Sequence, residues 1–293
     1  MRHPFRPGLT ACALLALAGC AAPGGTSAPA TVEAGQASID QRWVDTVVAA
    51  DKAGTEFPGY LTARPGASLA QAYAAQARLV ATEYGTGKAI GGFKGGFASP
   101  EALARFGITK PAIGVLPARG RVMAPYRLRL DDFRKLVIEC EIGFELARDV
   151  TDPIPNVAAM KRLVAHLGPA IELPDVALAS GVDHPLADMV AANISAARYI
   201  FVPSHTVATG GDINAIRAEL ARDGGPFGAD SARKAYGDQW EALRSALNTA
   251  IEVGYRPKAG DVVLTGSIVQ VVAERGHYTA RYGSLGQVEF GIE

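Results

Sequence analysis

The chain has few cysteines and no excess of charge of either sign, and both features limit what it can be. Its 293 residues carry 29 Lys and Arg against 29 Asp and Glu, so the formal net charge is zero. This balance argues against a general nucleic-acid binder, which needs a basic excess. No uninterrupted apolar run reaches the roughly 20 residues of a membrane-spanning helix. With 48% hydrophobic residues the chain is nevertheless apolar enough to fold around a core.

The N-terminal residues predict an export signal that is not part of the fold. Arg2 and Arg6 precede a short apolar stretch from Leu9 to Ala18. The stretch ends in Leu17-Ala18-Gly19-Cys20, which resembles the bacterial lipobox, whose cysteine is lipidated and becomes the mature N-terminus. A plain secretory signal with a chance cysteine, or a misassigned start, are the alternatives. Ala21 follows the cysteine instead of Asp, so the resemblance implies the periplasmic face of the outer membrane over the inner one.

The following segment is rich in Ala, Gly, Pro, Ser and Thr and predicts a flexible tether. We therefore expect a signal peptide over residues 1–19, a tether over 20–37 and a single domain over 38–293. Cys12 lies in the signal and Cys20 would carry lipid, which leaves Cys140 alone. An exported protein with one remaining thiol has no internal disulfide, so its stability has to come from its core.

Hydrophobic periodicity predicts a mixture of helices and strands. Helical stripes run over 39–50, 73–84, 157–167 and 240–251, and Ser99-Pro100 predicts the start of a short helix to Phe106. Strands are predicted at 136–146, 170–173, 199–202, 262–264 and 268–273, with a hairpin strand at 216–220 before Asp223-Gly224. Because the two kinds of element do not alternate regularly, the pattern predicts an α+β fold and no doubly wound sheet.

The strand at 136–146 points most directly to chemistry. Its even positions are all apolar, whereas its odd positions include Glu139, Glu141 and Glu145. Glu139 and Glu141 leave the same face, with Cα atoms roughly 6.5–7 Å apart. Two carboxylates that close can converge on one cation, and without it their repulsion would raise one pKa. Oxygen ligands suit a hard divalent ion such as Mg²⁺, Mn²⁺ or Ca²⁺.

The alternative for these acids is a solvated strand face. Cys140 points to the opposite, apolar face, which predicts a small core residue and no nucleophile. A third acid would distinguish a metal site from a solvated face. Glu172 lies between apolar residues in a short predicted strand, where a carboxylate needs a partner. An Arg partner or a turn would satisfy Glu172 equally well.

Several motifs in order resemble the 2-keto-4-pentenoate hydratase family, within the fumarylacetoacetate hydrolase superfamily. The resemblance covers the chain from about residue 39 to the end. It is carried by Gly92-Phe93-Lys94-Gly95-Gly96-Phe97, Phe106-Gly107-Ile108-Thr109-Lys110-Pro111, Ile138-Glu139-Cys140-Glu141-Ile142, Ala170-Ile171-Glu172, Asp188 to Ser195, Gly260-Asp261-Val262-Val263-Leu264-Thr265-Gly266-Ser267, and Gly283 to Val288.

The resemblance implies a mixed β-roll or β-sandwich fold with flanking helices and a homo-oligomer. It implies a Mg²⁺ or Mn²⁺ ion held by Glu139, Glu141 and Glu172. It places Lys94 beside the substrate in a glycine-rich turn, the alternative being a solvent-facing loop lysine. The implied substrate donors are Asn193, Ser195 and Ser267.

The implied reaction is a hydro-lyase reaction on a small 2-oxo acid. Water adds to a 2-hydroxydienoate, as in the catabolism of aromatic compounds, and gives a 4-hydroxy-2-oxo acid. Lys94 would transfer a proton or offset developing charge. A 2-oxo acid decarboxylase and a C–C hydrolase would use the same site, although Thr265-Gly266-Ser267 argues mildly against the hydrolase. A lipoprotein that binds a 2-oxo acid without catalysis is a third alternative.

The chain departs from the family pattern at three places, all outside the acid motif. Ala192 stands where the family has Asp, and Gly237-Asp238-Gln239 stands where it tends to have Gly-His-Pro. The stretch from Pro117 to Arg121 lacks the expected acidic residues. Export is a further conflict, because relatives that degrade ring-cleavage products work in the cytoplasm. We expect contact with a membrane only through the lipid on Cys20.

Overall fold

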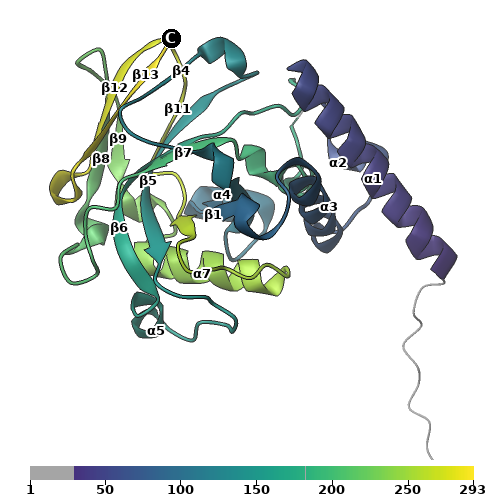
Figure 1. Ribbon diagram of the computed structural model, residues 1–293, viewed down its shortest axis with the longest axis horizontal. Coiled ribbons are helices and arrows are strands. Elements are labelled where there is room, and N and C mark those ends of the chain that lie inside the picture. The colour runs from purple at the N-terminus through teal and green to yellow at the C-terminus, as the bar shows by residue number, and fades with distance from the viewer. Residues whose placement is uncertain (1–29, 182) are drawn as a thin grey trace, which may run out of the picture.

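The computed structural model describes residues 30–181 and 183–293 (Figure 1). The predicted signal, Cys20 and residues 20–29 of the predicted tether lie outside the described residues. Helix α1 (Ala30–Ala53) begins inside the segment predicted as a tether, so residues 30–37 are helical. Among the helices of the described ranges, none combines the length and apolar character that a membrane span requires.

A curled, mixed sheet of eight strands is the larger of the two sheets (Figure 1). Its hydrogen-bonded order is β2-β1-β10-β5-β6-β7-β3, and β11 also pairs with β5. The strands are β1 (Ile90–Gly96), β2 (Ala112–Pro117), β3 (Arg121–Val122), β5 (Val137–Leu146), β6 (Val164–Leu173), β7 (Arg198–Phe201), β10 (Val262–Leu264) and β11 (Val269–Val272). Parallel pairs (β1 with β10, β3 with β7) occur beside antiparallel ones, which confirms the α+β expectation.

A second sheet of five strands has the order β4-β13-β12-β8-β9. Its strands are β4 (Tyr126–Leu128), β8 (Arg217–Arg222), β9 (Gly225–Ser231), β12 (Gly276–Arg281) and β13 (Gln287–Ile292). β8 and β9 form the hairpin predicted at Asp223-Gly224. Apolar side chains of β8, β12 and β13 are buried and contribute to a core that is continuous with that of the larger sheet.

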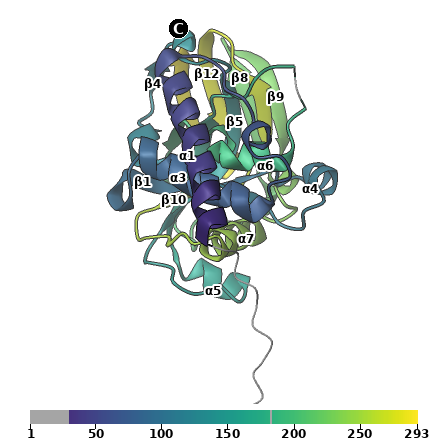
Figure 2. The same cartoon turned by 90° about the vertical axis from the view of Figure 1, so that its right-hand side faces the viewer.

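Helices pack against the larger sheet and against one another (Figure 2). They are α2 (Tyr60–Ala63), α3 (Leu69–Glu83), α4 (Pro100–Phe106), α5 (Val157–Lys161), α6 (Leu186–Ala191) and α7 (Gln239–Glu252), with short 3-10 turns at Gly87–Ala89, Ala118–Gly120, Leu130–Asp132, Asn193–Ser195, Ile213–Ala215, Ala232–Lys234 and Gly283–Leu285. Ser68 and Gln71 form a capping box that starts α3, and Ser99 caps α4 as predicted. The stripe predicted for α7 is buried at Leu243 and Leu247.

The helix predicted over residues 157–167 is wrong in its second half. α5 ends at Lys161, and Val164 and Leu167 belong to β6, which continues to Leu173. Gly168 and Pro169 disfavour a longer helix, and pairing with β5 buries the same apolar side chains in a sheet. The short strand predicted at 170–173 is therefore the end of a long one.

The glycine-rich segment around Lys94 is also different from the prediction. It is the strand β1, between β2 and β10, and no turn. Lys94 lies opposite Gly114 of β2, and a Cβ atom at Gly114 would stand 2.8 Å from Lys94 Cγ. The absence of a side chain at Gly114 therefore leaves room for the aliphatic part of a buried lysine.

Gly114→Ala tests this packing. Because the added methyl group overlaps Lys94, we expect the free energy of unfolding to fall by about 1–3 kcal/mol in urea denaturation. Gly225→Ala on β9 is the control, since its Cβ would lie 3.5 Å from the nearest atom, the Arg222 carbonyl oxygen. It should change stability by less than about 0.5 kcal/mol. Equal stability of Gly114→Ala and the wild type would contradict the packing described.

Candidate metal centre

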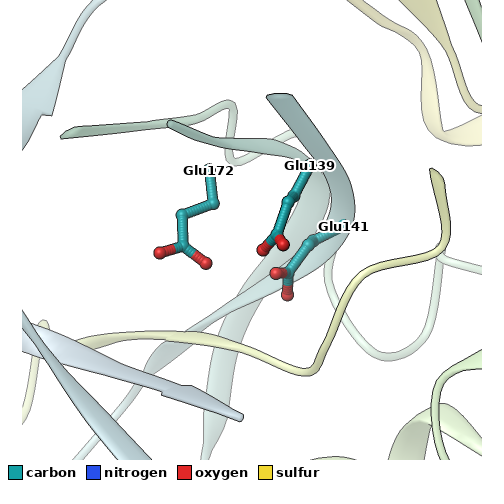
Figure 3. A group of neighbouring side chains, drawn as sticks. All are labelled: Glu139, Glu141 and Glu172. Atoms are coloured by element: carbon teal, nitrogen blue, oxygen red, sulfur yellow. The ribbon is translucent and has the colours of Figure 1, made fainter. Parts of the chain in front are cut away.

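Two neighbouring strands bring three carboxylates to one point. The antiparallel register of β5 and β6 sets Glu139 directly opposite Glu172, and Glu141 follows two residues later on the same face. One oxygen from each carboxylate lies within 4.8 Å of the others, and the three groups point toward one another (Figure 3). Glu141 and Glu172 are fully buried and Glu139 is 8% exposed. A solvated strand face, the alternative for these acids, is therefore excluded.

Each carboxylate is held through one oxygen by a donor from a different segment. The Gly266 N–H donates to Glu141 Oε2 (2.7 Å), and Gln270 Nε2 of β11 donates to Glu139 Oε1. Lys94 Nζ of β1 forms an ion pair with Glu172 Oε1. These donors fix the orientation of the three acids.

Two oxygens of the cluster have no hydrogen-bond partner. Glu141 Oε1 and Glu172 Oε2 are buried without a donor within reach. A buried carboxylate oxygen without a partner destabilises the folded state, because it has lost its hydrogen bonds to water and has gained none in the protein. A hard divalent cation would satisfy both oxygens, since such ions take carboxylate ligands from several strands. The donor set therefore fits a divalent metal ion.

The electrostatics of the site show the same deficit of positive charge. Burial raises the pKa of Glu172 to about 8, with the charge of Lys94 opposing and that of Glu139 adding to this rise. Burial also raises the pKa of Glu141 well above its ordinary value, and Glu172 and Glu139 raise it further. For Lys94, burial lowers the pKa, but the pull of Glu172 and Glu139 is larger and the net shift is upward. One ammonium group is not enough to neutralise three buried acids.

Glu139 of the cluster and Lys94 beside it line a cavity of about 690 Å³, whereas Glu141 and Glu172 are not part of its lining. Its polar lining includes Ser195, Ser267 and Gln270. Charged or titratable side chains outside the cluster also line it, namely Glu101, Arg105, Lys135, Asp183, His184 and Lys234. Its apolar lining includes Phe97, Val137, Leu178, Met189 and Ile194. A small acid thus has both polar groups and apolar surface available for binding.

The other predicted site residues have different places. Ser195 and Ser267 line the cavity, and Ser267 Oγ donates to the Val269 carbonyl oxygen (2.9 Å). Asn193 does not line it. Its Oδ1 accepts from the Val115 N–H (2.7 Å) and its Nδ2 donates to the Val115 carbonyl oxygen (2.9 Å). Both polar atoms are thus occupied, which gives Asn193 a structural role in place of the predicted donation to a substrate.

The single thiol of the predicted domain faces away from the acid cluster. Cys140 is fully buried on the opposite face of β5, as predicted. Burial raises its pKa to about 12, so the thiolate is absent at neutral pH. Cys20, the predicted lipidation site, lies outside the described residues.

Two residues of the site escaped sequence reasoning. Gln270 stands opposite Glu139 in the β5–β11 register, and its polar side chain among apolar neighbours is the signal that was available. The Gly266 N–H is a backbone group, so the residue type at this position does not predict its hydrogen bond to Glu141. Both supply donors to the acid cluster.

Glu141→Gln tests the charge deficit without metal. Because Glu172 has a raised pKa, the folded state holds protons that the unfolded state releases, and wild-type stability should fall as the pH rises from about 5 to about 8. Removing one acid should weaken this fall and make metal-free Glu141→Gln more stable than the wild type at about pH 8. Millimolar Mg²⁺ should raise the melting temperature of the wild type and not that of Glu141→Gln.

Glu145→Gln is the control for that measurement, because Glu145 lies on the same strand but is partly exposed and outside the cluster. It should behave like the wild type in both experiments. A Glu141→Gln protein that is less stable than the wild type without metal, and equally stabilised by Mg²⁺, would refute the electrostatic account.

Comparisons with known proteins agree with the geometry. The chain is 28% identical over 226 residues to a 2-keto-4-pentenoate hydratase of Burkholderia vietnamiensis, covering 76% of this chain and 86% of the relative. It is also 28% identical to a 2-keto-4-pentenoate hydratase of Paraburkholderia phymatum, over 69% of this chain and 78% of the relative. No family model matches the chain.

Solved structures share the fold at lower identity. A 4-oxalocrotonate decarboxylase from Pseudomonas putida G7, in complex with magnesium and adipate, has a TM-score of 0.78 at 20% identity and covers 89% of this chain and 98% of its own. A fumarylpyruvate hydrolase from Pseudomonas aeruginosa, with Mn²⁺ and pyruvate, has a TM-score of 0.54 at 14% identity, over 68% and 88% of the two chains. The chain therefore has the fold of these enzymes, and its sequence similarity to 2-keto-4-pentenoate hydratases supports the family that the motifs indicated.

Proposed function

We propose that the chain is a divalent-metal-dependent hydratase that adds water to a 2-hydroxydienoate and gives a 4-hydroxy-2-oxo acid. The observation that carries this proposal is the buried acid cluster, with two carboxylate oxygens still free, next to Lys94 and to a cavity of about 690 Å³ that Lys94 and Glu139 line. The similarity to hydratases, at 28% identity over most of both chains, supports the reaction type. Mg²⁺ and Mn²⁺ are the ions that we propose.

Glu139, Glu141 and Glu172 would hold the ion, each through the oxygen that its protein donor leaves free. When bound, a divalent cation supplies a Lewis acid for the 2-oxo acid head of the substrate. Gln270 and the Gly266 N–H hold Glu139 and Glu141 in place, so these two carboxylates need no reorganisation when a substrate binds.

Lys94 is the group that we propose for proton transfer. Its ammonium lies between Glu172 and the Ile194 carbonyl oxygen (3.1 Å) and also lines the cavity. It can give a proton to C5 of the dienol while the 2-hydroxyl group releases its proton to solvent, which ketonises the substrate and leaves an alkene between C3 and C4. Water then adds to the remaining alkene: its hydroxyl goes to C4 and its proton to C3. Solvent in the cavity that Lys94 lines can then return a proton to its amine.

The rest of the cavity would bind and orient the acid. Ser195 and Ser267 both lie on the lining, and we propose that their hydroxyl groups bind a carboxylate or oxo group of the substrate. Ser267 would have to give up its hydrogen bond to the Val269 carbonyl oxygen to do so. Phe97, Leu178 and Met189 offer an apolar surface to the hydrocarbon part of the substrate. These contacts would hold the alkene near Lys94 and limit the access of bulk water.

The test is turnover of 2-hydroxydienoates by the protein loaded with Mg²⁺ or Mn²⁺, followed by ultraviolet absorbance and product mass. We expect loss of the diene absorbance and a product heavier by one water. Release of CO₂ would mean a decarboxylase, and two acid products would mean a C–C hydrolase. Binding of 2-oxo acids without any turnover would mean a binding protein, and each of these three results would replace the hydratase.

Lys94→Met tests the proton-transfer group in the same assay. It should lower kcat by about 10²-fold or more, the usual contribution of a positioned acid or base. Lys88→Met is the matched control, because Lys88 is an exposed lysine just before β1 and should keep wild-type kcat. Wild-type turnover by Lys94→Met would remove Lys94 from the mechanism.

We also propose, from the N-terminal sequence, that Cys20 carries a lipid anchor and that the protein works on the periplasmic side of the outer membrane. In a bacterial host that exports the full chain, radiolabelled palmitate should enter the wild type and not Cys20→Ser, and only the wild type should fractionate with the outer membrane. An unlabelled wild type would contradict the anchor.

A homo-oligomer is a further part of the proposal, to be measured by light scattering.

A further inference from the structure

Three consecutive residues beside the site have a backbone conformation that side chains disfavour. Asn193, Ile194 and Ser195 have φ angles of 53°, 48° and 58°, just after α6. None of them is glycine, although L-residues rarely enter the left-handed region and hardly ever do so in succession. Such a turn persists only where the surrounding contacts hold it, and it is often found at functional sites.

The side chain of Asn193 provides the strongest of these contacts. It accepts from the Val115 N–H and donates to the Val115 carbonyl oxygen, so it satisfies both backbone groups of one residue on β2. β2 is an edge strand of the larger sheet, and the Asn193 amide takes the place of a neighbouring strand there. The Asp175 N–H donates to the Ser195 carbonyl oxygen (3.0 Å) and holds the other end of the turn.

The turn presents its middle carbonyl oxygen to Lys94. Lys94 Nζ donates to the Ile194 carbonyl oxygen at 3.1 Å and to Glu172. An ammonium group has three protons, so these two acceptors leave one proton for the cavity that Lys94 lines. Without the Ile194 carbonyl oxygen, the three carboxylates would be the dominant attraction on the ammonium.

We infer that Asn193 is a positioning residue for proton transfer: its clamp on Val115 holds the left-handed turn, and the turn holds Lys94 with one N–H directed to the cavity. The inference rests on the proposed function, because it takes Lys94 as the proton-transfer group. In this inference Asn193 does not contact the substrate. Its loss should therefore lower kcat and leave KM nearly unchanged.

Asn193→Gly is the discriminating variant. Glycine adopts positive φ without strain, so the variant loses the clamp and little of the backbone preference. Asp223→Gly is the matched control. Asp223 also has a positive φ (50°) and also accepts from the backbone of a neighbouring strand, at the His277 N–H (2.8 Å), but it lies in the β8–β9 hairpin and outside the cavity lining.

In the turnover assay with saturating Mg²⁺, Asn193→Gly should lose at least tenfold in kcat while KM stays within threefold of the wild type. Asp223→Gly should keep wild-type kcat. Asn193→Asp, which keeps the acceptor for the Val115 N–H, is measured in the same way if Asn193→Gly does not fold. Wild-type kcat in the folded Asn193 variant, or a rise in KM that accounts for the lost activity, would overturn the inference.

A second readout is independent of turnover and so separates this inference from the proposed function. In protein labelled with ¹⁵N-lysine, the Lys94 ammonium should give a protected signal, identified by its absence in Lys94→Met. Asn193→Gly should shift or broaden that signal and Asp223→Gly should not. An unchanged signal in Asn193→Gly would overturn the positioning role even if the wild type proves to be a different enzyme.

Discussion

The interaction on which the site depends is the burial of three carboxylates next to a single ammonium group. Glu139, Glu141 and Glu172 are all but excluded from water, and Lys94 is the one buried cation in contact with them among the described residues. If all four groups are ionised, two negative charges remain without compensation. Because burial makes such charges expensive, the cluster must hold protons or take up a divalent ion.

The sheet holds the three acids close together despite their mutual repulsion. They leave two hydrogen-bonded strands at facing positions, so backbone pairing fixes their separation. Gln270 and Gly266 then hold two of the carboxylates from the neighbouring strand and the loop that precedes it. The energy that packing and backbone hydrogen bonds contribute to the fold thus maintains a cluster that would be unfavourable alone. Such a site is ready for a cation before the cation arrives.

The same arrangement explains the place of Lys94. Lys94 comes from β1, which is separated from β5 by β10 in the sheet, and its aliphatic part passes a glycine on β2. Its ammonium reaches Glu172 and a carbonyl oxygen of the left-handed turn. A proton donor is thereby held beside the proposed metal ligands and at the cavity. This is the combination that chemistry next to a 2-oxo acid requires.

Sequence reasoning reached the acid cluster because a strand has a period of two. The alternation around Cys140 placed Glu139 and Glu141 on one face, but it could not show that this face is also buried, since burial depends on the loop that carries Gly266. It missed the strand β1 because glycines usually mark turns, whereas here they allow close packing. It mistook the role of Asn193, because a side chain that clamps backbone and one that binds a ligand have the same sequence signature.

The most direct measurement of the central claim is the position of a bound manganese ion. Crystals grown with Mn²⁺ and recorded near the manganese absorption edge give an anomalous difference peak for each ion. The account predicts one strong peak within coordination distance, about 2.0–2.4 Å, of carboxylate oxygens of Glu139, Glu141 and Glu172 together. A peak elsewhere, with the three acids still unoccupied by metal, would contradict it.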